Sequence, residues 1–443
     1  MTMKYHIITF GCQMNVSDSE RIAKVLKNIG FLESNSLEDA NLIIINICSI
    51  RQSAIDRVNG KIKSLSISVP HPSLNKNRKI LLTGCILKKD KINLRKHCNG
   101  IFKIDELIKL PSLLKRLGFK IKKNDTEKNK HYLQVAAEHQ SNITAYVPIM
   151  TGCNNFCAYC VVPYVRGPEI SRPADDILCE IKSLVKRGVK EVWLLGQNVN
   201  SYSLTSANTR TGNDFAKLLK MVNDIEGNFW IRFTSSHPKD LSREMIEVFA
   251  KSDKLTPYFN LPIQSGSDEI LKLMNRPYSV KKYKNLIKQT RDAFKKYRKG
   301  IEKEIAISTD VIVGFPGETK KYFKDTIKTF ENINVAFAYI SRYSPRSETA
   351  AFKLKDNVSH SEKKQREKRL LEIIEKSALK FNKKFLNKKV DVLVLKKQKD
   401  FYLGKTRHYQ TIRFLNDNEN KIGEFVKVKV TKIAPYGLEG KIQ

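Results

Sequence analysis

The chain has 443 residues, of which 81 are Lys or Arg and 45 are Asp or Glu, so its formal net charge is +36. Hydrophobic residues make up 41% of it, which is typical of a globular protein, and no run of eighteen apolar residues is present to span a membrane. Residues 1–6 lack the apolar segment of a signal peptide, so we expect a cytoplasmic protein. The charge favours a nucleic-acid partner, although abundant Lys, Asn and Ile also indicate a bias toward AT-rich codons.

Three cysteines near the N-terminus, the N-terminal triad, each come after a strand-like run. They are Cys12 after 4–10, Cys48 after 41–47 and Cys85 after 79–84. Helical patterns over 17–28 and 50–65 follow the first two, so strands and helices alternate as in a parallel sheet. Ligands of such sheets bind outside the carboxyl ends of the strands. The pattern leaves two interpretations open: one cluster site with three thiolates, or three separately buried core cysteines.

A second group of cysteines, the central triad, follows the strand-like run 146–150. Cys153, Cys157 and Cys160 lie within eight residues, spaced C-x3-C-x2-C. Three thiolates without a fourth protein ligand leave one iron of a cubane iron–sulfur cluster open to a small molecule. Zinc is the main alternative, but structural zinc needs four closed ligands, and the sequence has no second C-x-x-C pair and no H-x3-5-H. Three unrelated thiols would seldom cluster so densely.

The polar residues 121–142 predict a linker before a central domain at 143–375. Strands are expected near 146–150, 191–195, 229–234, 258–262, 305–313 and 336–341. Helices are expected near 173–187, 213–225, 242–251, 280–298 and 318–331. Six such units predict an incomplete (βα)6 barrel, whose active site lies at the C-terminal strand ends. Candidate cofactor or substrate contacts at or near those ends are Gln197, Arg232, Ser235, Gln264 and Asp310, with ordinary loop or core hydrogen bonding as the alternative.

The last part of the chain, 380–443, follows a basic helical stretch at 361–386 and switches to strand-like alternation. Residues 390–395 and 425–431 are the clearest strands. Aromatic and basic residues interleave between them: Tyr402, Arg407, Tyr409, Arg413 and Phe414. A small β-barrel with such a face can stack bases and follow phosphates, as OB-type folds do. A purely structural barrel is the alternative.

These motifs resemble those of the radical S-adenosylmethionine (SAM) enzymes, and of their methylthiotransferase branch in particular. The central triad and the run Cys160-Val-Val-Pro-Tyr-Val-Arg-Gly167 carry this resemblance. Phe10-Gly-Cys-Gln-Met-Asn15, Asn46-Ile-Cys-Ser-Ile-Arg51 and Thr83-Gly-Cys85 resemble the three cysteine motifs of the family's N-terminal domain. The stretches 403–414 and 431–441 resemble the TRAM RNA-binding domain. One departure is Ser347-Glu348, where the family usually has Pro-Gly, which changes the backbone options of that loop.

The resemblance implies an α/β protein of three domains. These are a Rossmann-like parallel-sheet domain at 1–135, a partial (βα)6 radical SAM core at 143–375 and a TRAM β-barrel at 380–443. It also implies two 4Fe–4S clusters and SAM as cofactors, with metal-binding and catalytic roles for all six triad cysteines. The central triad would hold the cluster that cleaves SAM into a 5′-deoxyadenosyl radical, and the N-terminal triad would hold the cluster that carries the sulfur. The five strand-end candidates would contact SAM or substrate.

The stretch Leu194-Leu-Gly-Gln-Asn-Val-Asn-Ser-Tyr202 resembles the branch that acts on isopentenylated adenosine beside the tRNA anticodon. The implied reaction is methylthiolation at carbon 2, whose unactivated C–H bond requires a radical cofactor. The implied partners are that tRNA and a reductant protein such as a flavodoxin or ferredoxin, and we expect a monomer with no membrane contact. The sulfur donor is not indicated. Two alternatives stay open: a sister enzyme acting on threonylcarbamoyl-adenosine or a ribosomal protein, and a non-catalytic iron–sulfur protein that binds RNA.

Overall fold

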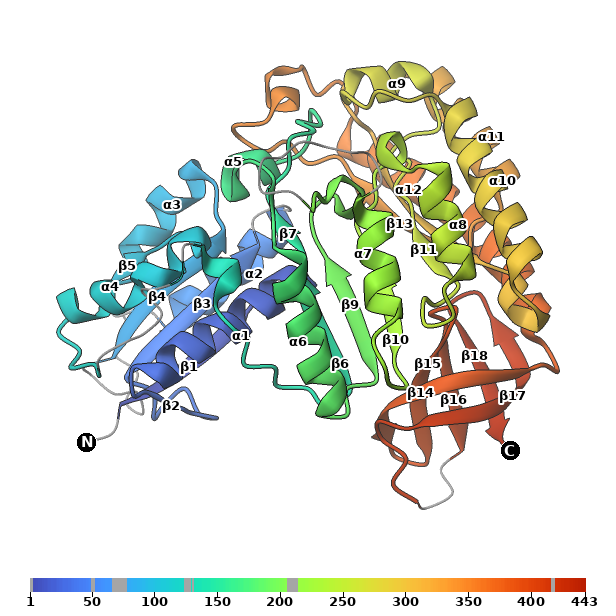
Figure 1. Ribbon diagram of the computed structural model, residues 1–443. Helices are drawn as coiled ribbons and strands as arrows, with labels where there is room; N and C mark the ends of the chain where they lie inside the picture. Colours follow the sequence, from blue (N-terminus) through green and yellow to red (C-terminus); the bar gives the residue numbers. More distant parts are fainter. Residues whose placement is uncertain are drawn as a thin grey trace. The chain divides into compact units, whose positions relative to one another are not determined.

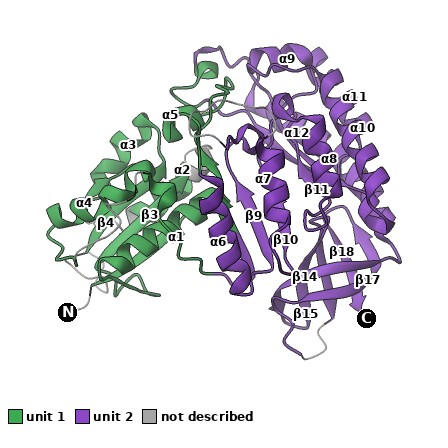
Figure 2. Ribbon diagram, in the orientation of Figure 1, with its two compact units in different colours: residues 1–140, 146–172, 346–352 green, residues 141–145, 173–345, 353–443 purple. Residues whose placement is uncertain are grey.

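The computed structural model describes residues 3–48, 52–65, 78–122, 129, 131–204, 214–415 and 419–443 (Figure 1). The chain forms two compact units (Figure 2). The first unit comprises 1–140, 146–172 and 346–352, and the second comprises 141–145, 173–345 and 353–443. Both cysteine triads therefore belong to the first unit. The linker expected at 121–142 lies partly outside the described residues, and no described helix is long and apolar enough to cross a membrane.

A five-stranded parallel sheet in the order β2-β1-β3-β4-β5 forms the centre of the first unit. Its strands are β1 (Lys4–Thr9), β2 (Leu32–Glu33), β3 (Leu42–Cys48), β4 (Lys79–Cys85) and β5 (Gly100–Ile101). Its helices include α1 (Gln13–Asn28), α2 (Gln52–Leu65), α3 (Lys88–Leu94) and α4 (Leu110–Arg116). Every residue of β3 is buried, which explains why its residues are apolar apart from Asn46. The expected parallel sheet is confirmed. Cys48 and Cys85 end their strands rather than follow them, because strand pairing extends to these two residues.

Two three-stranded sheets, in the orders β10-β9-β6 and β11-β12-β13, supply the strands of the central region. They are β6 (Thr144–Pro148), β9 (Glu191–Leu195), β10 (Trp230–Phe233), β11 (Tyr258–Asn260), β12 (Ala306–Val313) and β13 (Phe337–Arg342). The intervening helices are α6 (Ala174–Lys186), α7 (Asp214–Asn223), α8 (Arg243–Lys251), α10 (Val280–Tyr297) and α11 (Lys320–Ile333). These positions confirm the expected strands and helices to within two residues. The short helices α5 (Val162–Arg166) and α9 (Asp268–Leu273) were not expected.

The C-terminal strands close into a barrel in the order β14-β15-β16-β18-β17. The strands are β14 (Lys389–Gln398), β15 (Phe401–Thr406), β16 (Thr411–Leu415), β17 (Phe425–Ala434) and β18 (Gly437–Ile442), and α12 (His360–Asn382) precedes them. The small β-barrel is therefore confirmed. Only β14 and β17 were visible as clear strands in the sequence, because the other three are short and depend on their partners for burial. Glycines at 404 and 440 lie where an added Cβ atom would come within 2.6 Å of a carbonyl oxygen on the neighbouring strand.

Arg232 of β10 connects the central strands of the second unit to its C-terminal barrel. Its Nε donates to Glu191 Oε1 at 2.5 Å, and its Nη1 and Nη2 donate to the carbonyl oxygens of Arg407 and Thr406 at 2.8 and 2.9 Å. Four aromatic rings surround the guanidinium group: Trp193, Trp230, Tyr258 and Tyr409. Arg232 is 1% exposed. The expected cofactor contact does not fit this geometry, because Arg232 lies within β10 and its guanidinium group binds the protein itself.

We expect Arg232→Met to destabilise the protein, because Glu191 would keep a buried charge without its cation. Breaking one side of a buried ion pair costs about 3–5 kcal/mol. For a unit of this size that lowers Tm by roughly 10 °C. The measurement is thermal unfolding followed by circular dichroism. Arg232→Met with Glu191→Gln should recover most of the loss, and Arg243→Met, which removes an exposed i,i+4 pair, is the matched control. Equal Tm values for Arg232→Met and the control would contradict this structural role.

Candidate functional site

The parallel sheet of the first unit gathers the N-terminal triad at one edge. Cys48 and Cys85 lie opposite each other in the register of β3 and β4, and their side chains are hydrogen-bonded. Cys12 is the N-cap residue of α1, three residues after the end of β1. A Cβ atom placed on Gly11 would lie 2.9 Å from the Cβ of Cys48, and the thiol of Cys12 interacts electrostatically with Cys85. Three cysteines from distant parts of the chain therefore form one group.

Two buried asparagines support this group. Asn15 Oδ1 accepts hydrogen bonds from the backbone nitrogen and the Sγ of Cys12, each at 3.4 Å. Asn15 Nδ2 donates to Asn46 Oδ1 at 2.9 Å, and Asn46 Nδ2 returns a bond to the Asn15 carbonyl at 2.8 Å. The loop after β1 is thereby held against the end of β3. Sequence reasoning missed both residues as site residues, although each lies inside a cysteine motif.

The central triad lies on a sharply bent loop. Gly152 has φ +78°, and a Cβ atom at this position would lie 1.8 Å from the carbonyl oxygen of Pro168, so only glycine fits. Phe156 also takes a positive φ, of 47°. The backbone nitrogen of Cys153 donates to the carbonyl of Gly167 at 3.2 Å, which closes the loop. The fold therefore presents three thiols on one short, constrained turn.

The thiols fit the chemistry of an iron–sulfur cluster. None of the eight cysteines, all of which lie in the described part of the chain, is joined in a disulfide. The hydrogen bond from Cys48, followed by the Arg166 cation, outweighs burial and lowers the pKa of Cys85 to about 6, so this thiol ionises near neutral pH. In the described residues, no three His, Cys, Asp or Glu side chains surround one point as ligands of a single metal ion would. In an iron–sulfur cluster each thiolate binds a different iron, so the three sulfurs do not have to surround a single point.

Arg166, the last residue of α5, connects the two triads within the first unit. Its Nε donates to Cys85 Sγ at 3.1 Å, and its Nη2 donates to Asp18 Oδ2 at 2.7 Å. The side chains of Arg166 and Asp18 are 2% and 0% exposed, respectively. Sequence reasoning missed this pair because its members are 148 residues apart. The only available signal was the position of Arg166 in the motif that follows the central triad.

The segment 346–352 also contacts the central loop, through a hydrogen bond of 2.7 Å from the Ala351 nitrogen to the Ala158 carbonyl. Glu348 stands where the resembling family usually has glycine, and it takes a left-handed φ of 74°. Its Oε1 accepts a hydrogen bond from the Lys88 nitrogen at 2.7 Å. Left-handed backbone costs a non-glycine residue about 1 kcal/mol or more, and this bond offsets part of that strain. Glu348 therefore adopts the left-handed backbone conformation that glycine favours.

In the second unit, four of the five expected contact residues are half-buried at or near the carboxyl ends of the central strands. They are Gln197, Ser235, Gln264 and Asp310. Ser235 and Gln264 have φ values of +65° and +69°. Strained non-glycine backbone concentrates at functional sites, where the surroundings must hold it in place. Gln264 is held by pairing with β12, through its nitrogen to the Asp310 carbonyl at 2.8 Å.

Several buried polar atoms beside these residues have no hydrogen-bond partner within the described structure. They are Gln197 Oε1, Asn198 Oδ1, Asn200 Oδ1 and Nδ2, Ser236 Oγ and His237 Nε2. Each buried polar group left without a partner costs about 1–3 kcal/mol. Their concentration after β9 and β10 indicates a place where a polar ligand or ordered water completes the hydrogen bonds. These residues, apart from Gln197, were not among the expected contacts.

His237 supplies a neutral hydrogen-bond donor to this group. Burial, followed by the nearby Arg276, lowers the pKa of His237 to about 2, so its ring is neutral at physiological pH. Its Nδ1 accepts from the Lys239 nitrogen at 3.2 Å, which places the proton on Nε2. A cavity of about 250 Å3 adjoins this region and includes Asn200 and Tyr202 in its wall. The strand ends therefore offer both donors and acceptors beside a cavity.

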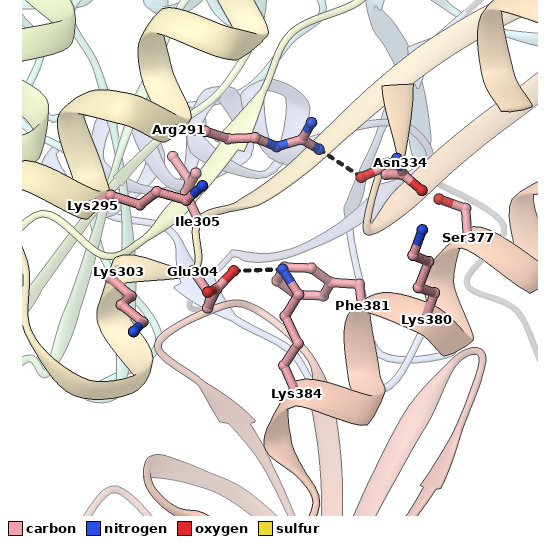
Figure 3. A pocket seen from close by; sticks show the side chains of 10 residues that line it. All are labelled: Arg291, Lys295, Lys303, Glu304, Ile305, Asn334, Ser377, Lys380, Phe381 and Lys384. Atoms are coloured by element: carbon pink, nitrogen blue, oxygen red, sulfur yellow. Dashed lines mark hydrogen bonds and ion pairs between the residues drawn. The ribbon is translucent and has the colours of Figure 1, made fainter. Parts of the chain in front are cut away.

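A separate basic pocket of about 190 Å3 lies among α10, α12 and the end of α11 (Figure 3). Its charged residues are Arg291, Lys295, Lys303, Glu304, Lys380 and Lys384. Arg291 Nη2 donates to the Asn334 carbonyl at 2.6 Å, and Lys384 pairs with Glu304 at 2.5 Å. Lys295, Lys303 and Lys380 supply the remaining positive charge. The pocket therefore suits an anion.

Models of known protein families match most of the chain. Residues 147–330 match the Radical SAM superfamily, 4–103 match the Uncharacterized protein family UPF0004, and 383–442 match the TRAM domain. Among solved structures, the radical S-adenosylmethionine methyltransferase TsrM from Kitasatospora setae is similar, with a TM-score of 0.53 and 11% identity over 77% of this chain and 75% of that chain. This likeness shows the fold alone. The fold and the central cysteine loop thus define the class of radical SAM proteins.

Similar curated proteins show which family within the radical SAM class the chain belongs to. Proteins from Clostridium botulinum and Carboxydothermus hydrogenoformans are each 39% identical to this chain. The first match covers 99% of this chain and 96% of the relative, and the second covers 98% of each. Both are named tRNA-2-methylthio-N(6)-dimethylallyladenosine synthase, as is a relative from Alkaliphilus oremlandii that is 37% identical over 99% of this chain and 92% of its own length. The chain belongs to this family of radical SAM methylthiotransferases.

Proposed function

We propose that this protein adds a methylthio group to carbon 2 of N6-isopentenyladenosine in tRNA. The observation that carries the proposal is the pair of three-thiol groups in one compact unit, because methylthiolation needs both a radical and a sulfur. The names of the full-length relatives support the same reaction. The C-terminal barrel, which matches the TRAM domain, supports an RNA substrate.

The two triads are the proposed ligands of two 4Fe–4S clusters, and the polar strand ends of the second unit are the proposed site of SAM and the target base. When bound, the clusters supply the electron that cleaves SAM and the sulfur that is transferred. The protein's own part is to hold these groups. Asn15 and Asn46 orient Cys12, while Gly152 shapes the central loop. Gln197, Ser235, Gln264 and Asp310 remain proposed contacts, and the donors of Asn200 and His237 join them.

The proposed partners follow from this chemistry. The substrate is a tRNA that already carries the isopentenyl group, which implies a cytoplasmic location. A reductant protein such as a flavodoxin or ferredoxin would supply the electrons, and we propose that the enzyme acts as a monomer. The run Gly196-Gln-Asn-Val-Asn200 disfavours the sister enzymes of the family. Buried polar atoms at the strand ends lack hydrogen-bond partners in the described structure. They disfavour a non-catalytic RNA-binding role, because RNA binding alone would not use them.

Replacing Cys153, Cys157 and Cys160 with Ala is expected to halve the iron of the anaerobically reconstituted protein, from about eight atoms to about four. This variant should form no 5′-deoxyadenosine from SAM. The matching variant of Cys12, Cys48 and Cys85 should also lose half of the iron but still form 5′-deoxyadenosine, without methylthiolated tRNA. Iron assay and chromatography of the products measure these outcomes.

Cys98→Ala with Cys179→Ala is the control, because neither residue belongs to a triad, and it should retain all of the iron. Retention of full iron by the central-triad variant would contradict the assignment of that loop. Normal product yield from the N-terminal variant would leave those cysteines with only a structural role.

The enzyme is expected to prefer isopentenylated tRNA over the unmodified adenosine. Burying the five-carbon chain at roughly 25 cal/mol per Å2 supplies about 2–3 kcal/mol, which corresponds to roughly 30- to 150-fold discrimination. Single-turnover rates on matched modified and unmodified transcripts measure the preference. Equal rates on the two transcripts would end the substrate proposal while leaving the iron–sulfur chemistry untouched.

The three lysines of the basic pocket are expected to bind tRNA phosphates. Replacing Lys295, Lys303 and Lys380 with Ala should weaken binding of modified and unmodified tRNA alike. The slope of log K against log salt should become shallower by up to about three, or about one for each lost contact. Filter binding over a salt series measures both quantities. A control that replaces the exposed Lys320, Lys324 and Lys328 of α11 should change the slope less, and equal effects would argue against a specific pocket.

A further inference from the structure

Arg166 presents three nitrogen atoms in a site that is closed to solvent. Nε donates to Cys85 Sγ at 3.1 Å, and Nη2 donates to Asp18 Oδ2 at 2.7 Å. Nη1 is buried and has no hydrogen-bond partner in the described structure. The guanidinium group therefore pairs its charge with Asp18 and still directs one donor at a cysteine thiol while a second donor remains unused.

A purely structural ion pair explains only part of this arrangement. Asp18 alone would satisfy the charge, and a buried N–H group without a partner costs about 1–3 kcal/mol. Arg346 forms another buried pair with an aspartate of the first unit, Asp90, at 2.6 Å. Among the hydrogen bonds described above, the one from an arginine to a triad sulfur comes from Arg166.

We propose that Arg166 is a positioning residue for the iron–sulfur cluster held by the N-terminal triad. Its Nε–H donates to the sulfur of Cys85, and its Nη1–H donates to a sulfide of the bound cluster. This inference rests on the proposed function, which assigns a cluster to that triad. Hydrogen bonds to cluster sulfurs stabilise the more negative, reduced form and so raise the reduction potential.

The same residue links the two catalytic segments. Arg166 follows the central triad by six residues, at the end of α5, while its thiol partner Cys85 lies 81 residues earlier in the chain. A planar guanidinium group with several donors can hold α1, β4 and α5 in one arrangement, whereas an ammonium group is a point charge on a flexible stem. Arg166 therefore sets where the N-terminal cluster lies with respect to the loop of the central triad, within the first unit.

The test is a redox titration followed by electron paramagnetic resonance. It uses full-length protein in which Cys153, Cys157 and Cys160 are Ala, so that only the N-terminal cluster gives a signal. In this background, Arg166→Met is combined with Asp18→Asn, which removes the donors without leaving a lone buried carboxylate. The matched control combines Arg346→Met with Asp90→Asn, which removes the other buried pair.

We expect the Arg166 double variant to bind the same iron as its parent but to titrate at a lower potential, while the control pair keeps the parent potential. An unchanged potential would overturn the inference. If the double variant does not fold, the reduction potential of the Arg166→Lys single variant is measured instead. A potential below that of the parent would support the role of the guanidinium donors, and the parent value would overturn it.

The same experiment separates failure of this inference from failure of the proposed function. If the parent protein, with its N-terminal triad intact, binds no cluster, then the proposed function fails and the inference fails with it. If the parent binds the cluster but its potential does not depend on Arg166, only the inference fails.

Discussion

Parallel strands end at the same edge of a sheet, and the candidate sites of this chain depend on that constraint. The N-terminal triad comes from three strand ends, and pairing in register places Cys48 directly beside Cys85. The polar residues of the second unit likewise follow β9 and β10. A shift of β4 by one residue against β3 would turn Cys85 toward the other face, because side chains alternate along a strand. In the observed register, the sulfur of Cys85 accepts the hydrogen bond from Arg166 Nε.

In each unit, a buried arginine binds segments that are distant from each other in the sequence. Arg232 joins the central strands to the C-terminal barrel through Glu191 and two backbone carbonyls. Arg166 joins α5 to α1 through Asp18. Such pairs add little net stability, because desolvation of the charges offsets most of their attraction. Loss of one partner is costly, however, so each pair enforces one arrangement of segments that are distant in the sequence.

Some of the strained backbone of the described chain lies in the candidate site loops. Phe156 in the central loop, and Ser235 and Gln264 at the strand ends, all have positive φ without being glycine. Local propensity opposes these conformations, so neighbouring structure must impose them. Near them, the amide of Asn200 and the ring of His237 keep buried polar atoms without hydrogen-bond partners in the described structure. Both features lower stability, and a bound ligand would recover part of that loss.

The sequence by itself determined the strands and helices of the central region, the parallel character of the N-terminal sheet and the positions of the two triads. Hydrophobic periodicity and cysteine spacing are local properties, so they can be identified without coordinates. Tertiary structure alone decided which side chains meet. Arg232 looked like a ligand contact near a strand end but is buried against the C-terminal barrel, while Arg166 and Asp18 pair across 148 residues. The sequence also could not show that Glu348 adopts the backbone of a glycine. The physical reason is that a side chain's partners depend on how distant segments pack, and neither periodicity nor spacing records that packing.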